Sequence, residues 1–564
     1  MNNGLRAVRR KAISKLLKSV FGVKQLRDGQ QQVIDSVLDG KDTLAIMPTG
    51  SGKSLCYQIP ARMLAGVTVV VSPLISLMKD QLEKLDALGI NATQVNSTLN
   101  REEEDLALEG IRAGLHQIVF CTPERPSQPA FIDLLRTVQV ALVVIDEAHC
   151  ISQWGHDFRP AYLEMAASID ALGKPPVLAL TATATDDVVA DIGRQLGRPR
   201  LKVVNTGIYR PNLHYRVLQV TNNDERYARA LELVQATEGV GIVYCATVKA
   251  AEEMHQVLQH AGQSVALYHG KLAAAERKRN QDAFMAGEQR VMVATNAFGM
   301  GIDKPDTRFV IHLQLPPNLE SYYQESGRAG RDGGDAECTL LYFQDDKRVQ
   351  QFFLVKHYPS ANDIKAVYDA VCTLAASATV TFDSLAAQVD QLASSKLKIC
   401  LKMLKDGRLL RQNRKLDYLV TATAPSADLF AELAEVYAQK QERDRQALEQ
   451  MVSYAVSGFC RWKVLLDYFS DAVDGFERCC RCDNCRNPPP VAEIVIRDDE
   501  FERHADAGQT GGDAAATPAF AAGASVRVPK YALGTVVSTA GDQVTIVFPE
   551  HGEKTFLATF VEPA

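Results

Sequence analysis

Short apolar runs alternate with longer amphipathic stretches from Phe21 to about Thr206. The short runs end at turn residues and predict buried strands at 43–47, 68–72, 117–121, 141–145 and 177–181. The amphipathic stretches between them, such as 75–88, predict helices. This alternation is typical of a parallel sheet covered by helices, in which the loops at the carboxyl ends of the strands carry the chemistry.

The same alternation begins again near Tyr209 and continues to about Phe343. Its predicted strands are 241–245, 265–268, 290–295 and 309–313. The sequence therefore predicts an α/β fold with two tandem parallel-sheet domains, at 1–206 and 207–345.

Residues 361–424 have a different pattern, with helices predicted at 364–374, 382–389 and 395–405 and strands at 409–410 and 416–420. Three helices followed by two short strands indicate a winged helix whose wing has its tip at 412–415. The third helix and the wing are strongly basic, with only Asp406 as a nearby acid, which suits the phosphates of duplex DNA. A solvated basic face without a partner is the alternative. The basic residues are Lys396, Lys398, Lys402, Lys405, Arg408, Arg411, Arg414 and Lys415.

The rest of the chain contains three further segments. A long polar helix at 428–459 opens a helical module, at 426–487, that is rich in cysteine. Residues 488–524 are rich in Pro, Ala, Gly and Asp and predict a flexible linker. Alternating residues at 525–528, 534–538, 543–548 and 554–559 then predict a small SH3-like or Tudor-like β-barrel at 525–564, which would bind a peptide or nucleic acid or stabilise the chain.

The first candidate for chemistry is the stretch AIMPTGSGKS at 45–54, between a predicted strand and a predicted helix. Its glycines let the backbone amides turn inward around a phosphate chain, with Lys53 beside the phosphates and the Ser54 hydroxyl free to hold Mg²⁺. A glycine-rich turn that binds nothing is the alternative. The predicted phosphate-binding residues are Thr49, Gly50, Ser51, Gly52, Lys53 and Ser54.

Two adjacent acids, Asp146 and Glu147, directly follow the predicted strand at 141–145. A carboxylate at a strand end can hold Mg²⁺ through water, which is the role predicted for Asp146. Glu147 can accept a proton from the water that attacks the γ-phosphate. Most pairs of adjacent acids simply lie in solvent, but a position after a buried strand, about 90 residues beyond Lys53, makes this pair a strong candidate.

The second domain supplies Arg328 and Arg331, three residues apart at the predicted start of a glycine-broken helix. Arginines can face a transferring phosphoryl group from across a cleft and raise the rate by orders of magnitude. A surface salt-bridge patch is the alternative.

Four cysteines form the metal candidate: Cys460, on a predicted helical stretch, then Cys479, Cys482 and Cys485 in a C-x2-C-x2-C pattern. Four thiolates suit a closed, structural Zn²⁺ site. An iron–sulfur cluster is the alternative. Cys480 lies outside the spacing and is interpreted as a bystander.

Composition narrows the classes of protein. The 564 residues allow about three to five domains at roughly 150 residues each. No apolar run is long enough to cross a membrane, and twelve cysteines without a secretory signal favour thiols and metal over disulfides. The net charge is only −6, so affinity for nucleic acid must come from local patches. We therefore expect a cytoplasmic protein of the bacterial type, associated with the nucleoid.

The motifs together resemble those of the RecQ family of superfamily-two DNA helicases. The resemblance runs over 21–343 and again over 443–485. It rests on TGSGKSLCYQIPA at Thr49, VVVSPLISLMKDQ at Val69, DEAHCISQWGHDFRP at Asp146, ALTATAT at Ala179, VATNAFGMGIDKPDTRFVIH at Val293 and LESYYQESGRAGRDG at Leu319. The run ISQWGHDFRP is the most specific of these. In the family the zinc region usually precedes the winged helix, whereas here the winged helix comes first.

The resemblance implies two RecA-like domains with ATP bound between them. Gln30 and Arg27 match the family's adenine-reading motif, and Gln324, Arg328 and Arg331 would complete the site from the second domain. Asp303 would couple the two domains. The implied cofactors are ATP, Mg²⁺ and Zn²⁺.

Residues 151–160 correspond to the family's aromatic-rich loop, which links DNA contact to hydrolysis. Trp154 and Phe158 offer flat faces for unstacked bases, worth about 1–3 kcal/mol per base, and Arg159 adds charge. Core packing is the alternative for the two aromatic residues.

These observations predict an ATP-dependent DNA helicase. By resemblance it would move 3′ to 5′ on single-stranded DNA and unwind duplex or branched DNA in repair and recombination. Its partners would be single-stranded and duplex DNA, with single-strand-binding or other repair proteins. The alternatives are a DNA-stimulated translocase or remodeller that does not separate strands, a non-enzymatic DNA-binding scaffold, and an RNA motor.

Overall fold

The computed structural model describes residues 3–126, 128–152, 159, 161–162, 165–299, 304–357, 359–376, 379–392, 394–413, 417–421, 427–488, 524–528, 532–540, 543–548, 552–557 and 562–563. The chain divides into two compact units, Met1–Pro489 and Pro490–Ala564. Among the described residues, no helix combines the length and apolar character needed to cross a bilayer. The predicted linker falls almost entirely outside the described residues.

The first lobe of the larger unit is built on a seven-stranded, wholly parallel sheet with the order β3-β4-β2-β5-β6-β1-β7. Its interior strands are mainly apolar and almost wholly buried, so they pack helices on both faces, and separate cores lie on the two sides. The strands are β1 (Thr43–Ile46), β2 (Val67–Val71), β3 (Ala92–Val95), β4 (Ile118–Cys121), β5 (Val140–Ile145), β6 (Val177–Thr181) and β7 (Lys202–Asn205). The helical elements are α1 (Asn3–Ser19), α2 (Gln30–Leu38), α3 (Leu55–Met63), α4 (Ile75–Ala87), α5 (Arg101–Arg112), α6 (Pro129–Arg136), η1 (Ala148–Ile151), α7 (Met165–Ala171) and α8 (Asp186–Gln195).

The second lobe has a six-stranded parallel sheet with the order β10-β11-β9-β12-β13-β8. Its strands are β8 (Leu213–Gln219), β9 (Val240–Tyr244), β10 (Val265–Tyr268), β11 (Val291–Ala294), β12 (Thr307–His312) and β13 (Ala336–Tyr342). Its helices are α9 (Asn223–Ala236), α10 (Val248–His260), α11 (Ala274–Ala286) and α12 (Leu319–Ser326). The predicted α/β fold with two tandem sheets is therefore confirmed.

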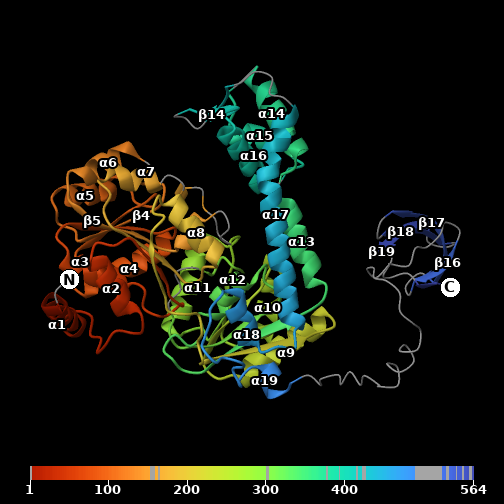
Figure 1. Cartoon of the computed structure of the whole chain (residues 1–564), viewed down its shortest axis with the longest axis horizontal. Coiled ribbons are helices and arrows are strands. Elements are labelled where there is room, and N and C mark those ends of the chain that lie inside the picture. Colours follow the sequence, from red (N-terminus) through yellow and green to blue (C-terminus); the bar gives the residue numbers. More distant parts are fainter. Residues whose placement is uncertain are drawn as a thin grey trace, which may run out of the picture. The chain divides into compact units, whose positions relative to one another are not determined.

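A helical hairpin follows the second lobe. Helix α13 (Asp346–His357) leads away from it and α17 (Ala427–Val456) returns antiparallel, because Lys347 at the start of α13 pairs with Glu449 near the end of α17 at 2.7 Å. Figure 1 shows α17 running from the region of α18 to α14–α16. Helices α18 (Arg461–Tyr468) and α19 (Asp483–Arg486) then complete the cysteine-rich module.

In the sequence, a small unit with its own core lies between α13 and α17. It contains α14 (Ala361–Ala375), α15 (Phe382–Gln388), α16 (Ser394–Asp406) and the antiparallel pair β14 (Leu410–Gln412) and β15 (Tyr418–Val420). An isolated bridge from Val380 to Tyr418 adds a third strand position. Three helices with a three-stranded edge make a winged-helix arrangement, inserted into the hairpin.

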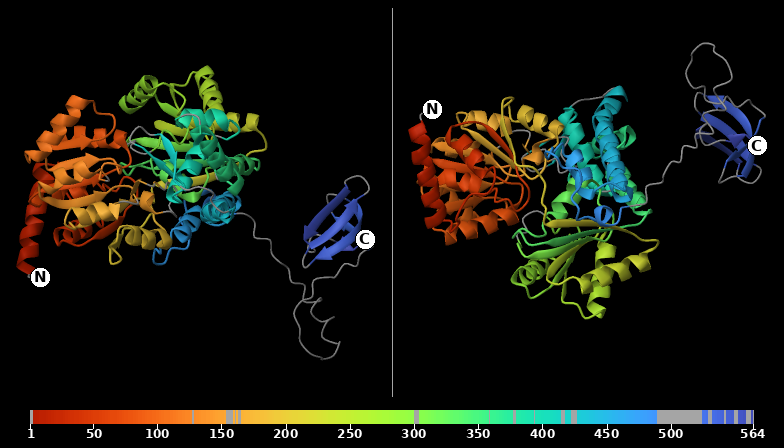
Figure 2. Two further views of the ribbon diagram at one scale, coloured as in Figure 1. Left: turned by 90° about the horizontal axis from the view of Figure 1, so that it is seen from above. Right: turned by 60° about the horizontal axis from the view of Figure 1, so that its bottom comes forward.

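The second unit is a five-stranded antiparallel sheet, drawn in blue in Figure 2, with the order β19-β18-β17-β16-β20. Its strands are β16 (Ser525–Val528), β17 (Ala532–Ala540), β18 (Gln543–Phe548), β19 (Gly552–Leu557) and β20 (Glu562–Pro563). A meander of four strands, with a fifth paired back onto the first, is consistent with the small barrel that the sequence predicts.

Candidate nucleotide and zinc sites

The phosphate-binding loop lies between β1 and α3. Gly50 and Gly52 have φ of 78° and 81°, in the left-handed region that favours glycine. A Cβ at Gly50 would lie 2.9 Å from Cγ of Arg331, and one at Gly52 would lie 2.7 Å from Nε2 of Gln30. The two glycines therefore permit both the turn and the close approach of side chains from elsewhere in the fold.

Lys53 shares a cavity with the two acids at the end of β5. Its ammonium donates to the Met47 carbonyl at 3.1 Å. Burial lowers the pKa of Lys53, an effect that Glu147 and Asp146 oppose. Burial, followed by the charge of Glu147, raises the pKa of Asp146 to about 7, although Lys53 opposes that shift. The pocket thus holds negative charge that one lysine does not fully compensate, a suitable environment for a divalent cation.

The backbone at Glu147 is unusual, because this residue has a φ of 49°. Its Oε2 lies 3.4 Å from Nδ1 of His149, which in turn lies 3.1 Å from the Thr181 hydroxyl. The Thr181 hydroxyl donates to the carbonyl of Thr183. Contacts therefore run from the acids at the end of β5 to the loop after β6.

The second lobe reaches the same cavity through the turn after α12. The Thr49 hydroxyl donates to the Gly327 carbonyl at 2.9 Å, and Arg331 lies over Gly50. The cavity is lined by Thr49, Gly50, Gly52, Lys53, Ser54, Tyr57, Leu77, Gln81, Asp146, Glu147, Leu180 and Arg331. A single cavity therefore combines the phosphate loop, the two acids and one arginine of the other lobe.

The prediction that the arginines begin a helix is wrong. Helix α12 ends at Ser326, and Arg328 and Arg331 follow it in a turn where Gly330 has a φ of 56°. Glycine at 327 and 330 allows close approach, because a Cβ at Gly327 would lie 2.4 Å from the Thr49 hydroxyl oxygen and one at Gly330 would lie 2.5 Å from Nδ2 of Asn212. Arg331 lines the cavity, whereas Arg328 is buried in the second lobe near Gly299 and Gln324 is half-buried on α12.

The side chains of Gln30 and Arg27 bind backbone carbonyls of the phosphate loop. The Gln30 amide donates to the carbonyls of Ser51 and Gly52 at 3.0 and 2.9 Å, and its oxygen accepts from the Arg27 amide at 2.8 Å. The Arg27 guanidinium donates to the Gly50 carbonyl. Both predicted adenine-reading residues therefore contact the loop that would bind the phosphates. Asp303 lies outside the described residues.

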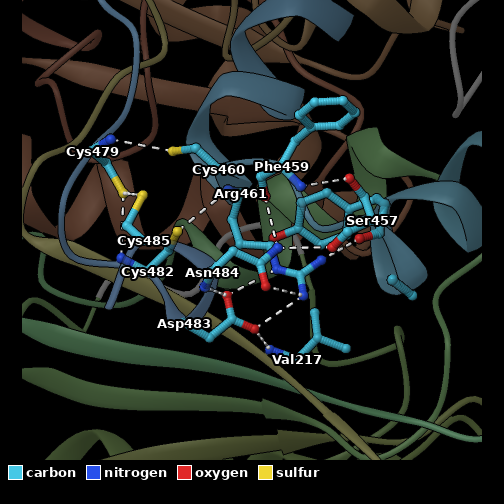
Figure 3. Close-up of polar contacts among 12 residues, drawn as sticks. Val217, Ser457, Phe459, Cys460, Arg461, Cys479, Cys482, Asp483, Asn484 and Cys485 are labelled. Atoms are coloured by element: carbon cyan, nitrogen blue, oxygen red, sulfur yellow. Dashed lines mark hydrogen bonds and ion pairs between the residues drawn. The ribbon is translucent and has the colours of Figure 1, made fainter. Parts of the chain in front are cut away.

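The four predicted zinc ligands come together around α18 and α19 (Figure 3). The Sγ atoms of Cys460, Cys479, Cys482 and Cys485 all lie within 4.8 Å of one another, and those of Cys479 and Cys485 are 3.9 Å apart. Tetrahedral Zn²⁺ with Zn–S bonds of about 2.3 Å requires sulfurs about 3.8 Å apart, so this set fits one ion. Cys460 caps α18 rather than lying within it, which corrects the predicted helical position. Cys480 is exposed and stands outside the cluster.

A polar network fixes this cluster to the second lobe. The buried Arg461 guanidinium binds Asp483 through two contacts of 2.9 and 3.0 Å, and Asp483 accepts from the Val217 amide on β8 at 2.9 Å (Figure 3). Asn484 donates to the carbonyls of Ser457 and Phe459. The cysteine module and edge strand β8 thus form one body, with a shared core.

The predicted DNA contacts are placed unequally. Trp154 and Phe158 lie outside the described residues. The Arg159 amide donates to the Cys150 carbonyl, and its guanidinium donates to the Pro73 carbonyl, both at 2.9 Å.

On the winged helix, Lys396 pairs with Asp363 at 2.7 Å, and the Lys398 ammonium lies 5.4 Å from the centre of the Phe382 ring. Lys402 is half-buried on α16. The ammonium of Lys396, one of the three predicted contact residues, therefore forms an ion pair within the winged helix, with the first turn of α14.

Three family models match the chain. The DEAD/DEAH box helicase model covers residues 27–192, the helicase conserved C-terminal domain model covers 225–333, and the RecQ zinc-binding model covers 414–486. The probable ATP-dependent DNA helicase RecS of Bacillus subtilis (strain 168) is 42% identical over 357 residues, which cover 63% of this chain and 72% of that protein. The chain belongs to the RecQ family.

Another RecQ-family relative is the ATP-dependent DNA helicase RecQ of the same bacterium, 48% identical over 342 residues. That match covers 60% of this chain and 57% of the relative, so the chain spans little more than half of that protein's length. Among solved structures, the Mycobacterium smegmatis helicase Lhr bound to single-stranded DNA and AMP-PNP aligns with a TM-score of 0.50 and 19% identity, covering 75% of this chain and 62% of that one. This last likeness concerns the fold alone.

The comparisons confirm the predicted family and the helical zinc-binding module of this RecQ chain. The match to a zinc-binding model, with one compact set of four sulfurs, favours zinc over an iron–sulfur cluster. Sequence reasoning missed Tyr57, Leu77 and Gln81 in the cavity lining. Leu77 and Gln81 lie four residues apart on α4, a spacing that places them on one helix face, but nothing in the sequence shows which face meets the cavity.

Proposed function

We propose that this protein is an ATP-dependent DNA helicase that moves 3′ to 5′ on single-stranded DNA and unwinds duplex or branched DNA in repair and recombination. The observation that carries the proposal is the cavity in which Arg331 of the second lobe meets Lys53, Asp146 and Glu147 of the first. A composite site of this kind ties hydrolysis to the approach of two lobes. The curated relatives are named as ATP-dependent DNA helicases. A cytoplasmic, nucleoid-associated location is part of the proposal.

In the proposed reaction Lys53 binds the β- and γ-phosphates, and the phosphate loop supplies backbone amides. Ser54 and Asp146 would hold Mg²⁺, which neutralises charge on the phosphates when bound. Glu147 accepts the proton of the attacking water. Gln324, Arg328 and Arg331 stabilise charge at the γ-phosphate from the second lobe, which requires Arg328 to turn toward the cavity. Asp303 couples the lobes.

In this proposal DNA lies across both lobes, on loops at the carboxyl ends of strands of the two sheets. Thr122 to Glu124 follow β4, and Thr295 follows β11, at positions suited to phosphate contact. Trp154 and Phe158 would stack on bases. Because they are close in sequence to Asp146 and Glu147, base binding there would be coupled to hydrolysis. The inserted winged helix would hold the duplex through the exposed Lys398, Arg408 and Arg411.

The decisive experiment is strand displacement on duplexes with a 3′ or a 5′ overhang, with and without ATP. We expect ATP-dependent unwinding of the 3′-overhang substrate only. Lys53→Ala and Glu147→Gln should each lower DNA-stimulated hydrolysis by about 100-fold or more and abolish unwinding, while DNA affinity stays within about 2-fold. Lys79→Ala, at an exposed helix position, is the matched control for Lys53→Ala and should behave as the native chain.

Hydrolysis stimulated by DNA without displacement of either strand would favour the translocase or remodeller. Hydrolysis retained by both Lys53→Ala and Glu147→Gln would refute the assignment of the site. DNA binding with no hydrolysis by the native chain would favour the scaffold.

A further inference from the structure

The segment that joins the two lobes touches both halves of the nucleotide site. It leaves the first lobe at Thr206, whose amide donates at 3.0 Å to the carbonyl of Ile46, the last residue of β1 before the phosphate loop. Two residues later the Ile208 carbonyl accepts from the Tyr323 hydroxyl on α12 at 2.7 Å. The joining segment is therefore bonded to the strand before the phosphate loop and to the helix before the arginine turn.

Arg210 lies at the centre of this segment and is buried. Its NH1 donates to the Gly327 carbonyl at 2.8 Å, and its NH2 donates to the carbonyls of Ala329 and Gly330 at 2.7 and 2.6 Å. These carbonyls belong to the turn that carries Arg328 and Arg331. A planar guanidinium presents several donors in fixed directions, so one side chain sets the positions of three backbone groups.

The turn receives further support from the same segment and from the other lobe. The Asn212 amide donates to the carbonyls of Gly330 and Gly334, both at 2.8 Å. The Gly327 carbonyl accepts from Thr49 of the phosphate loop as well as from Arg210. The turn lies beyond the end of α12, so these contacts hold it in place of a helical hydrogen-bond ladder.

We propose that Arg210 is a positioning residue that sets the placement of Arg331 over the phosphate site. Arg210 is not among the residues lining the cavity, so its effect on catalysis passes through the arginine turn. A shift of the joining segment would therefore displace the turn that carries Arg331. This inference rests on the proposed function, because it assumes that Arg331 acts on ATP.

The test compares Arg210→Ala and Arg210→Lys with the native chain in DNA-stimulated hydrolysis. A displaced catalytic group can cost about 100-fold in rate. We expect kcat to fall by about 10- to 100-fold in both variants, since lysine keeps the charge but cannot hold three carbonyls. KM for ATP, binding of AMP-PNP and binding of single-stranded DNA should stay within about 3-fold. Asn212→Ala, a milder change in the same support, should lower kcat by several-fold.

Arg226→Ala is the matched control. Arg226 is also buried in the second lobe, where it pairs with Asp346 at 2.7 Å and not with the arginine turn. Its loss should lower the melting temperature but leave kcat unchanged below that temperature. An unchanged kcat in Arg210→Ala and Asn212→Ala, or an equal fall in Arg226→Ala, would overturn the proposal.

A double-variant cycle separates this inference from the proposed function. If Arg210 acts through the turn, Arg210→Ala combined with Arg331→Ala should be no slower than Arg331→Ala alone. Additive losses would refute the positioning role while leaving the site intact. A normal rate in Arg331→Ala itself would refute the proposed function instead.

Discussion

Asp146 is the residue at which burial and function are most directly in conflict. Its carboxyl is enclosed beside Glu147, and its pKa is raised to about 7. The folded chain therefore binds this proton more tightly than the unfolded chain does. The resulting contribution to stability is present below about pH 4 and is lost as the pH rises through about 7. The nucleotide-free protein is thus less stable at a pH at which Asp146 is ionised, the state that the proposed Mg²⁺ site requires.

Asp146→Asn should therefore unfold at a higher temperature than the native chain, and the difference should be larger at pH 8 than at pH 5, because asparagine cannot ionise. Thermal unfolding without nucleotide or Mg²⁺ at the two pH values measures this. Asp133→Asn, at an exposed carboxylate on α6, is the control. Its difference in unfolding temperature from the native chain should be the same at pH 5 and pH 8. An Asp146→Asn difference independent of pH would contradict the role of burial.

At the scale of elements, the sequence predicted best where the pattern was apolar and continuous. The interior strands β1, β2, β4, β5 and β6 were all predicted, because they are mainly apolar and almost wholly buried. The edge strands β3 and β7 were missed because polar or exposed residues dominate them, which removes the apolar run that marks a buried strand. The interior strand β13 was also missed, because Glu337 and Thr339 interrupt its apolar residues.

The same limit applies within the candidate sites. Lys53, Asp146 and the four cysteines could be assigned to candidate sites because short-range spacing marks them in the sequence, and the structure brings each set together. Arg210 and Gln81 could not, because their partners lie far away in sequence and only the folded chain brings them together. Lys396 shows the reverse problem, since a basic residue on a predicted recognition helix forms a local ion pair with Asp363.

Two substitutions in the winged helix should separate contact with DNA from local structure. Arg411→Ala, at the exposed position of β14, should weaken duplex binding and lower the slope of log affinity against log salt by about 1. Lys396→Ala should leave that slope unchanged, because its ammonium pairs with Asp363, and should lower stability by about 1 kcal/mol or less. Fluorescence anisotropy at several salt concentrations measures both. A fall in slope for Lys396→Ala alone would reverse the assignment.

At the scale of the larger unit, the zinc module and the second lobe are mechanically one piece. They share one core, which includes Trp462, and the Trp462 indole donates to the Leu213 carbonyl at 3.1 Å. Asp471, just beyond α18, accepts from the Ile208 amide of the joining segment at 2.6 Å. Loss of metal should therefore disturb more than the cysteines themselves.

Elemental analysis of the purified chain should give about one zinc per molecule. Cys482→Ser, at a buried ligand, should lose the metal and lower the unfolding temperature, because structural zinc contributes directly to folding. Cys480→Ser, at the neighbouring exposed thiol, is the control and should retain both. Iron in the native chain, or zinc lost equally from both variants, would contradict the four-ligand assignment.

The length of α17 has a consequence for how small movements are transmitted. One end of this 30-residue helix is fixed in the core of the second lobe through Leu448 and Met451, and the other carries Phe430 into the core of the winged helix. Leu448 and Phe430 are 18 residues apart, so at 1.5 Å per residue the helix acts as an arm of roughly 27 Å between the two cores. If the lobe turned by about 10°, a modest angle for rigid-body rearrangements, the far end would sweep roughly 5 Å. That sweep exceeds the length of one nucleotide along a DNA strand, at about 3.4 Å.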